Sequence, residues 1–240
     1  MELNRPENRD VHATRFSFPP IPIDPEGAIL LIDKPYRCTS FDIVGKLKNY
    51  IKRELKIKMK VGHAGTLDPL ATGLMIVCVG SCTKKIESLM GMEKEYTGTF
   101  RLGETTSSYD MEKEVNETFP VDHITEQMIH ETALRFTGEL DQIPPHFSAV
   151  KINGKRAYEL AREGEEAVIQ PKKIVISTFE ITKIEMPDVE FRVVCSKGTY
   201  IRSLARDFGE ALQSGAHLTA LRRTKIGTYD VNNAIQVILH

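Results

Sequence analysis

The chain has 240 residues, of which 41% are hydrophobic and 27% are charged. This length and composition exclude a disordered tail and allow a buried core, in one large domain or two closely joined lobes. The 32 basic and 33 acidic residues give a net charge of −1, which by itself does not indicate a nucleic-acid partner.

The predicted elements begin after an arm that contains proline. Residues 1–27 include five prolines and predict an extended arm without its own core. Ala28 to Ile32 predicts a short strand. Thr39 and Asp42 form a variant capping box before a helix. The apolar side of that helix is expected to hold Val44, Leu47, Ile51 and Leu55.

The rest of the chain predicts strands and helices in irregular alternation. A glycine-containing loop over 62–73 precedes a buried strand over 74–79. Further strands are expected over 94–102, 148–152, 174–184 and 189–195, and helices over 124–136, 156–162 and 200–212. Because there is no strict βαβ period, the pattern predicts an α+β fold with a mixed, largely antiparallel sheet flanked by helices.

Charge is unevenly distributed along the chain. Seven basic residues crowd the stretch from Lys46 to Lys60, and a second basic set comprises Lys197, Arg202, Arg206, Arg222, Arg223 and Lys225. One face of the protein is therefore expected to be basic despite the neutral total. The alternative is that Lys46 to Lys60 forms only the solvated side of a helix.

Other features indicate the compartment and the redox state. The start of the chain has no apolar region typical of a signal peptide, and the longest apolar run, Leu74 to Val79, is too short to span a bilayer. We therefore expect a cytoplasmic protein with no membrane contact. The four cysteines form no Cys-x-x-Cys pair and are expected to be reduced and structural. Cys78 and Cys82 have no second Cys/His pair at ligand spacing, so no metal site is predicted.

The loop Gly62-His63-Ala64-Gly65-Thr66-Leu67-Asp68-Pro69-Leu70-Ala71-Thr72-Gly73 is the densest chemical signal. It lacks the Gly-Lys-Ser/Thr ending of a phosphate-binding loop, and His63 lacks the second histidine of a metalloprotease helix. Pro69 biases Asp68 away from the helical region, which fixes the direction of a carboxylate before a buried strand. Taken alone, Asp-Pro is more often a turn initiator, and His63 more often a packing residue.

This loop resembles the signature of the bacterial tRNA pseudouridine-55 synthases, the TruB family. Further motifs of that family are matched in order over about residues 28–230. They are Asp33-Lys34-Pro35, Lys94-Glu95-Tyr96 with Arg101-Leu102-Gly103, Pro144-Pro145 with Ser148 to Lys151 and Gly154 to Tyr158, Gly198 to Leu204, and Leu221 to Thr224. The resemblance implies the pseudouridine synthase fold with a central catalytic cleft, formed by residues 28–240.

The resemblance also implies an RNA isomerase that converts uridine 55 in the tRNA T-loop to pseudouridine without a cofactor. The matched catalytic residues are Asp68, the base-stacking Tyr96 and Arg202, which is expected to pair with Asp68. The matched substrate-binding residues are His63, Lys34, Asp110, Tyr200 and Leu204. The expected partner is the T-loop of tRNA, held at its phosphates by Lys46 to Lys60 and by Arg222 with Arg223, and the protein is expected to be a monomer.

The sequence departs from the family pattern at two places. The small C-terminal RNA-binding domain of the PUA type, present in many members, is expected to be absent, and the usual acid before Asp110 is missing.

Two other functions are possible alternatives. One is a catalytically silent RNA-binding protein, and the presence of Asp68, Tyr96 and Arg202 argues against it. The other is a small-molecule hydrolase using His63 and Asp68, for which no third catalytic partner is evident.

Overall fold

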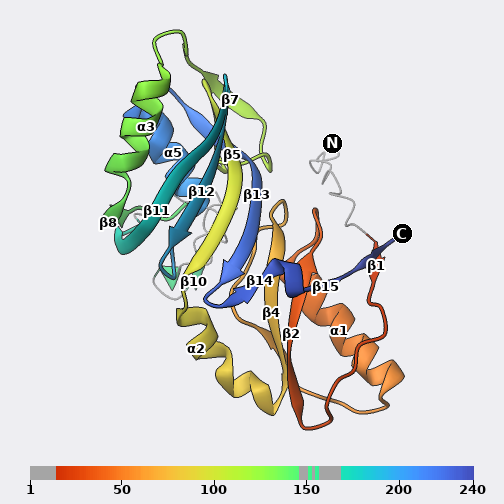
Figure 1. The fold of residues 1–240 in the computed structure, drawn as a ribbon. Coiled ribbons are helices and arrows are strands. Elements are labelled where there is room, and N and C mark those ends of the chain that lie inside the picture. Colours follow the sequence, from red (N-terminus) through yellow and green to blue (C-terminus); the bar gives the residue numbers. More distant parts are fainter. Residues whose placement is uncertain (1–14, 146–150, 153–154, 157–168) are drawn as a thin grey trace, which may run out of the picture. The chain divides into compact units, whose positions relative to one another are not determined.

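A computed structural model describes residues 15–145, 151–152, 155–156 and 169–240. The chain divides into two compact units, unit 1 with residues 1–86 and 233–240 and unit 2 with residues 87–232 (Figure 1). Of the predicted strand over 148–152, the described part is β9 (Lys151–Ile152), which pairs with β10 (Lys155–Arg156). The helix predicted over 156–162 lies outside the described residues, apart from Arg156 at the end of β10.

Unit 1 is built on a small sheet covered by one long helix. Its strands are β2 (Gly27–Lys34), β3 (Val61–His63), β4 (Thr72–Gly80) and β15 (Ile235–Gln236). Strands β2 and β3 both pair antiparallel with β4, and β15 pairs parallel with β2. The helix α1 (Ser40–Glu54) packs on this sheet, and a short 3₁₀ helix, η1 (Ser81–Lys85), follows β4.

The capping box predicted for α1 is present. The Thr39 side chain accepts a hydrogen bond from the Asp42 backbone N–H, and the Asp42 carboxylate accepts one at 2.8 Å from the Thr39 backbone N–H. These reciprocal bonds satisfy two backbone donors that the first helical turn leaves without partners. They set the start of α1 at Ser40.

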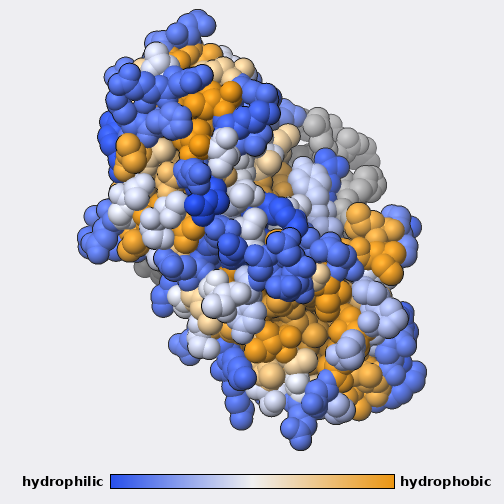
Figure 2. Space-filling view, in the orientation of Figure 1, coloured by the Kyte–Doolittle hydropathy of each residue, from blue (hydrophilic) through white to orange (hydrophobic). Residues whose placement is uncertain are grey.

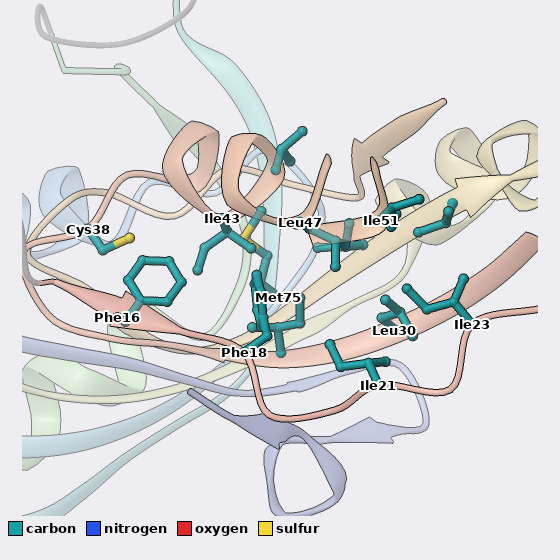
Figure 3. Close-up of a cluster of buried hydrophobic side chains, with 14 residues drawn as sticks. Phe16, Phe18, Ile21, Ile23, Leu30, Cys38, Ile43, Leu47, Ile51 and Met75 are labelled. Atoms are coloured by element: carbon teal, nitrogen blue, oxygen red, sulfur yellow. The ribbon is translucent and has the colours of Figure 1, made fainter. Parts of the chain in front are cut away.

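The described part of the N-terminal arm contributes to the core of unit 1. Strand β1 (Phe16–Ser17) pairs antiparallel with β16 (Ile238–Leu239). Four apolar side chains of the arm join those of β2, β4 and α1 in one buried cluster (Figure 3). The arm residues in that cluster are Phe16, Phe18, Ile21 and Ile23. Each such side chain stabilises the folded state by roughly 1.5–3 kcal/mol when fully buried.

Polar contacts with α1 also fasten the arm. Lys46 donates to the Phe16 carbonyl at 2.7 Å and lies 3.8 Å from the centroid of its ring. The backbone N–H of Ile21 donates to the Tyr50 hydroxyl at 2.7 Å. Strand β16 leaves two apolar residues 49% and 60% exposed, Ile238 and Leu239. Figure 2 shows hydrophobic surface where β1 and β16 lie.

Unit 2 contains a larger antiparallel sheet in the strand order β13-β5-β12-β11-β8. These strands are β5 (Lys94–Leu102), β8 (Gly138–Gln142), β11 (Lys172–Glu185), β12 (Asp188–Cys195) and β13 (Ala216–Ile226), and β14 (Tyr229–Asp230) pairs with β13. A hairpin of β6 (Glu104–Thr106) and β7 (Val115–Thr118) precedes α3. Among the described residues, the helices are α2 (Ile86–Gly91), α3 (Glu126–Arg135) and α5 (Ile201–Ala211), with a 3₁₀ turn, η2 (Val231–Asn233), after β14.

The core of unit 2 is an aromatic cluster between its sheet and α5. Phe100 of β5 stacks on Phe191 of β12 with a centroid separation of 4.2 Å. Phe208 of α5 lies 5.5 Å from Phe100 and 5.6 Å from Phe179 of β11. Helix α3 lies against β11 and α5 against β13, and the two helices contact each other (Figure 1). The predicted α+β fold with a mixed, largely antiparallel sheet is confirmed.

The helices of the described residues are short. The longest, α1, has 15 residues, and no helix in this part of the chain is both long and apolar enough to cross a membrane.

Candidate functional site

The loop that carries Asp68 is shaped by a turn and by two glycines. It connects β3 to β4, and Ala71 donates a backbone hydrogen bond at 3.1 Å to the Asp68 carbonyl, which closes a turn with Pro69 at its second position. Gly65 and Gly73 have φ angles of +116° and +103°, which residues with a side chain rarely adopt. Asp68 is half-buried, so a ligand can reach part of it.

Ser40 at the start of α1 and Cys38 just before it hold this loop on both sides of Asp68. The buried hydroxyl of Ser40 accepts a hydrogen bond from the Leu67 N–H at 2.9 Å and lies 3.2 Å from the Leu67 carbonyl, to which it donates. The Cys38 N–H donates to the Pro69 carbonyl at 3.3 Å. The two neighbours of Asp68 are therefore fixed by Cys38 and by the first residue of α1.

Lys34, predicted to bind substrate, lies beneath the same loop. Its side chain is completely buried, and its ammonium donates to the carbonyls of Cys38 at 2.6 Å, Pro35 at 3.0 Å and Pro69 at 3.3 Å. A buried ammonium is stable only when hydrogen bonds replace its lost hydration. These three bonds make Lys34 a positioning residue for the loop, and its contact with substrate stays a prediction.

His63 is the last residue of β3 and lies opposite Val77 of β4 in the register. It is half-buried, at the point where the strand enters the Asp68 loop. The adjacent Ala64 N–H donates to the Ile76 carbonyl at 2.9 Å, so the backbone on the loop side of His63 is also fixed.

In unit 2, Arg202 on α5 forms a buried ion pair with Asp110. The Arg202 Nε and an Asp110 carboxylate oxygen are 3.7 Å apart, and the side chains are 6% and 5% exposed. Arg202 also donates to the Ser108 carbonyl at 3.3 Å. The sequence predicted Asp68 as the partner of Arg202. Asp68 belongs to unit 1, and that second pairing stays a prediction.

A second arginine of α5, one turn after Arg202, holds the same segment after β6. The Arg206 guanidinium carbon lies 5.0 Å from the centroid of the Tyr109 ring, and the guanidinium donates to the Ile143 carbonyl at 3.2 Å. Tyr109 itself has a positive φ of 61°, and such strain is maintained only where the surroundings determine the conformation. Sequence reasoning had placed Arg206 only in a basic set.

Tyr96 lies on β5, opposite Val193 of β12 and Arg223 of β13, and is 9% exposed. Two residues before it, the Lys94 ammonium donates to the carbonyls of Met90 and Met92 at the end of α2. Burial, and after it the charge of Arg223, lower the pKa of Lys94 to about 8. Unit 2 therefore has two buried cations beside Tyr96.

Tyr200 and Leu204, the other predicted substrate-binding residues, are at the start of α5. Tyr200 is the N-cap residue, and the Gln142 side-chain amide clamps its backbone, accepting from its N–H at 2.8 Å and donating to its carbonyl at 3.1 Å. Leu204 is 1% exposed and lies in the core. The sequence did not single out Gln142, because a glutamine at the end of a strand has no distinctive spacing.

The cysteines of the described chain are all free thiols, three of them buried. Burial raises the pKa of Cys38 and of Cys195 to about 11, so both thiols are protonated and unreactive at neutral pH. Among the described residues, no group of three or more His, Cys, Asp or Glu side chains could hold a metal ion.

The chain is similar to known proteins over most of its length. The model of the TruB family pseudouridylate synthase N-terminal domain matches residues 52–201, and that of the tRNA pseudouridylate synthase B C-terminal domain matches residues 202–239. The chain is 60% identical over 216 residues to a tRNA pseudouridine synthase B of Flavobacterium johnsoniae, covering 89% of this chain and 94% of that protein. It is 52% identical to one from Phocaeicola vulgatus, covering 88% and 91%.

A solved structure supports the same fold. A chain in the structure of an H/ACA RNP bound to a substrate RNA containing 2′-deoxyuridine is 28% identical, with a TM-score of 0.63. The match covers 88% of the present chain and 51% of that chain, so the present chain spans about half the length of that protein.

Proposed function

The chain belongs to the TruB family of pseudouridylate synthases, and on that basis we propose that it isomerises a tRNA uridine to pseudouridine. The reaction breaks the N1–C1′ bond of uridine, turns the base and joins its C5 to C1′. The proton lost from C5 balances the proton gained at N1, so no atom or electron is exchanged with a co-reactant. The target we propose is the T-loop uridine at position 55.

The observation that supports this proposal best is the support around Asp68. A carboxylate that acts at the glycosidic bond, as nucleophile or as electrostatic stabiliser, needs a fixed direction. The turn that starts at Asp68 and the bonds of Ser40, Cys38 and Lys34 to its two neighbours provide that fixation. Such positioning contributes much of the rate of a catalysed reaction, because a displacement of the catalytic group by about 1 Å can lower the rate roughly a hundredfold.

Three further residues take their roles from the family resemblance. Tyr96 offers a flat ring on which the extruded base can stack. His63 fills the space that the base leaves in the opened T-loop. Arg202, held by Asp110, completes the catalytic set by pairing with Asp68. The buried position of Leu204 favours a supporting role in the core over a substrate contact.

Binding of tRNA is assigned to exposed cations, because phosphate contacts position an RNA without reading its sequence. Within the stretch from Lys46 to Lys60, every basic residue but the first is exposed. Lys46 is bonded to Phe16 in the arm, and Arg223 is 1% exposed, so these two are weaker candidates than the sequence implied. We propose that the protein acts as a monomer in the cytoplasm.

The test uses the purified protein and an unmodified tRNA transcript. Pseudouridine is mapped by reverse-transcription stops after carbodiimide treatment, with Asp68→Asn as the variant and the exposed Asp122→Asn as the matched control. We expect one stop at the T-loop uridine with the wild type and the control. Asp68→Asn is expected to give no stop while it still binds tRNA.

Two results would count against the proposal in different ways. A wild-type protein that binds tRNA but produces no stop favours the silent RNA-binding alternative. A stop that persists in Asp68→Asn removes Asp68 from the chemistry. Activity on free nucleosides or esters without RNA would instead favour the hydrolase alternative.

A further inference from the structure

Two lysines of the basic stretch share one face of α1 with an exposed phenylalanine. Phe41, Gly45, Lys48 and Lys52 follow the spacing i, i+4, i+7 and i+11, which places them in one row along a helix. We call this row the outer face of α1. We propose that it binds the RNA strand next to the target uridine, with a base stacked on Phe41 and phosphates held by the two lysines. This inference rests on the proposed function.

Phe41 is the most exposed large apolar residue among those described, at 78%. Ile43 and Leu47 of the same helix are fully buried, so α1 packs its apolar side against the core without Phe41. An exposed aromatic ring beside cations is the composition of surfaces that bind single-stranded RNA, where rings stack on unpaired bases and cations follow the backbone. The bases of a loop are available for such stacking.

Gly45, also on this face, is a glycine that the structure does not require. It lies inside a helix of 15 residues, where glycine is less favourable than alanine. A Cβ atom built at Gly45 meets nothing within 4 Å, so neither packing nor a positive φ requires glycine there. A missing side chain between Phe41 and Lys48 leaves room for a ribose-phosphate backbone to approach the helix closely.

The position of this face connects it to the catalytic loop. Phe41 directly follows Ser40, whose hydroxyl is bonded to Leu67, and Leu67 directly precedes Asp68. Nucleotides next to a uridine seated at Asp68 therefore have Phe41 within reach. Tyr36, 41% exposed and with the Arg37 guanidinium carbon 5.5 Å from its ring centroid, adds an aromatic and a cation to the same connecting segment.

The experiment measures tRNA affinity as a function of salt for four variants. Phe41→Ala is expected to bind tRNA roughly tenfold more weakly at every salt concentration, and Phe41→Tyr to bind like the wild type, because stacking needs only a ring. The double variant Lys48→Ala/Lys52→Ala is expected to reduce the slope of log affinity against log salt by roughly 1 to 2. Leu134→Ala, an exposed apolar residue of α3 at 70%, is the matched control and is expected to change nothing.

A fifth variant separates binding from stability. Gly45→Gln is expected to raise the melting temperature, since glutamine is the better helix former, and to weaken tRNA binding at the same time. A merely structural role for this face predicts no loss of affinity in the more stable protein.

Affinity of Phe41→Ala equal to that of Leu134→Ala, or a Gly45→Gln variant that binds as tightly as the wild type, would overturn the inference. Pseudouridine mapping of the wild type is run beside each titration. If the wild type forms pseudouridine and Phe41→Ala binds normally, the inference fails alone. If the wild type forms none but Phe41→Ala still weakens binding, the proposed function fails and the RNA-binding face stands.

Discussion

Ser40→Ala tests whether the bonds to Leu67 position the catalytic loop. The substitution removes one buried hydroxyl that serves both the N–H and the carbonyl of Leu67, at 2.9 and 3.2 Å. Leaving buried backbone groups without partners costs ~1–3 kcal/mol. For a chain of this size, each kcal/mol lowers the melting temperature by about 2–4 °C. We expect a measurable but tolerated loss of stability.

The catalytic loss should be larger than the stability loss implies. Without the bond to Leu67, the peptide before Asp68 is free to shift, and a displaced carboxylate meets the glycosidic bond in fewer productive orientations. We expect the single-turnover rate of pseudouridine formation to fall by roughly ten- to a hundredfold. The assay uses saturating enzyme, well below the melting temperature, so that neither weaker binding nor unfolding contributes.

Thr39→Ala is the matched control for this prediction. It removes the cap of the same helix, at a typical cost of about 1 kcal/mol, but leaves both bonds to Leu67 intact. Its single-turnover rate should stay close to that of the wild type. Equal rate losses in the two variants would show that the stability of α1 matters and that the bond to Leu67 does not. An unchanged rate in Ser40→Ala would refute the reasoning directly.

Three other predictions concern the buried charges and metal dependence. Asp110→Asn leaves Arg202 in a buried site without that countercharge and should lower the free energy of unfolding by about 3 kcal/mol. Asp188→Asn, in the half-buried pair with Arg101, should lower it by under about 1 kcal/mol. The pKa of Lys94 is lowered to about 8 from 10.5, so the unfolded state binds more protons between these pH values. Chemical denaturation should therefore show the wild type gaining stability relative to Lys94→Met as pH rises from 8 to 10.5. Addition of EDTA should leave pseudouridine formation unchanged, and a metal-dependent loss would contradict the mechanism.

Much of the fold follows from local patterns in the sequence. The alternation over 94–102 coincides with β5, and the capping residues before α1 give its start within one residue. Strand β13 was missed although it has 11 residues. Its pairing with β5 shifts register between Leu218 and Ala220 and again between Arg223 and Lys225, and each shift moves the following side chains to the other face. The sequence of β13 therefore does not show the alternation of apolar and polar residues, with a period of two, that predicts a strand.

Motifs single out candidate site residues, but they do not show which of those residues serve packing. Asp68 and Arg202 stand in motifs that resemble those of the family, and their catalytic roles stay predictions. Leu204 stands in the same motif as Arg202 but is a core residue, which only its burial reveals. Ser40 and Gln142 act through hydrogen bonds to the backbone of residues far along the chain. Sequence reasoning cannot pair such groups because the bonds depend on the tertiary fold.

The two interpretations of Asp68-Pro69 that the sequence left open, a turn initiator and a catalytic position, are compatible. The turn is present, and the residues from Lys34 to Ser40 hold the residues on either side of Asp68. The bonds that do so span 35 positions from Lys34 to Pro69 and 27 from Ser40 to Leu67. The groups that hold the two neighbours of Asp68 thus lie between Lys34 at the end of β2 and Ser40 at the start of α1, and the next residue is Phe41. The same segment holds the Asp68 loop and continues into the outer face of α1. The residue proposed to act on the uridine and the residues proposed to hold its neighbours are therefore positioned together.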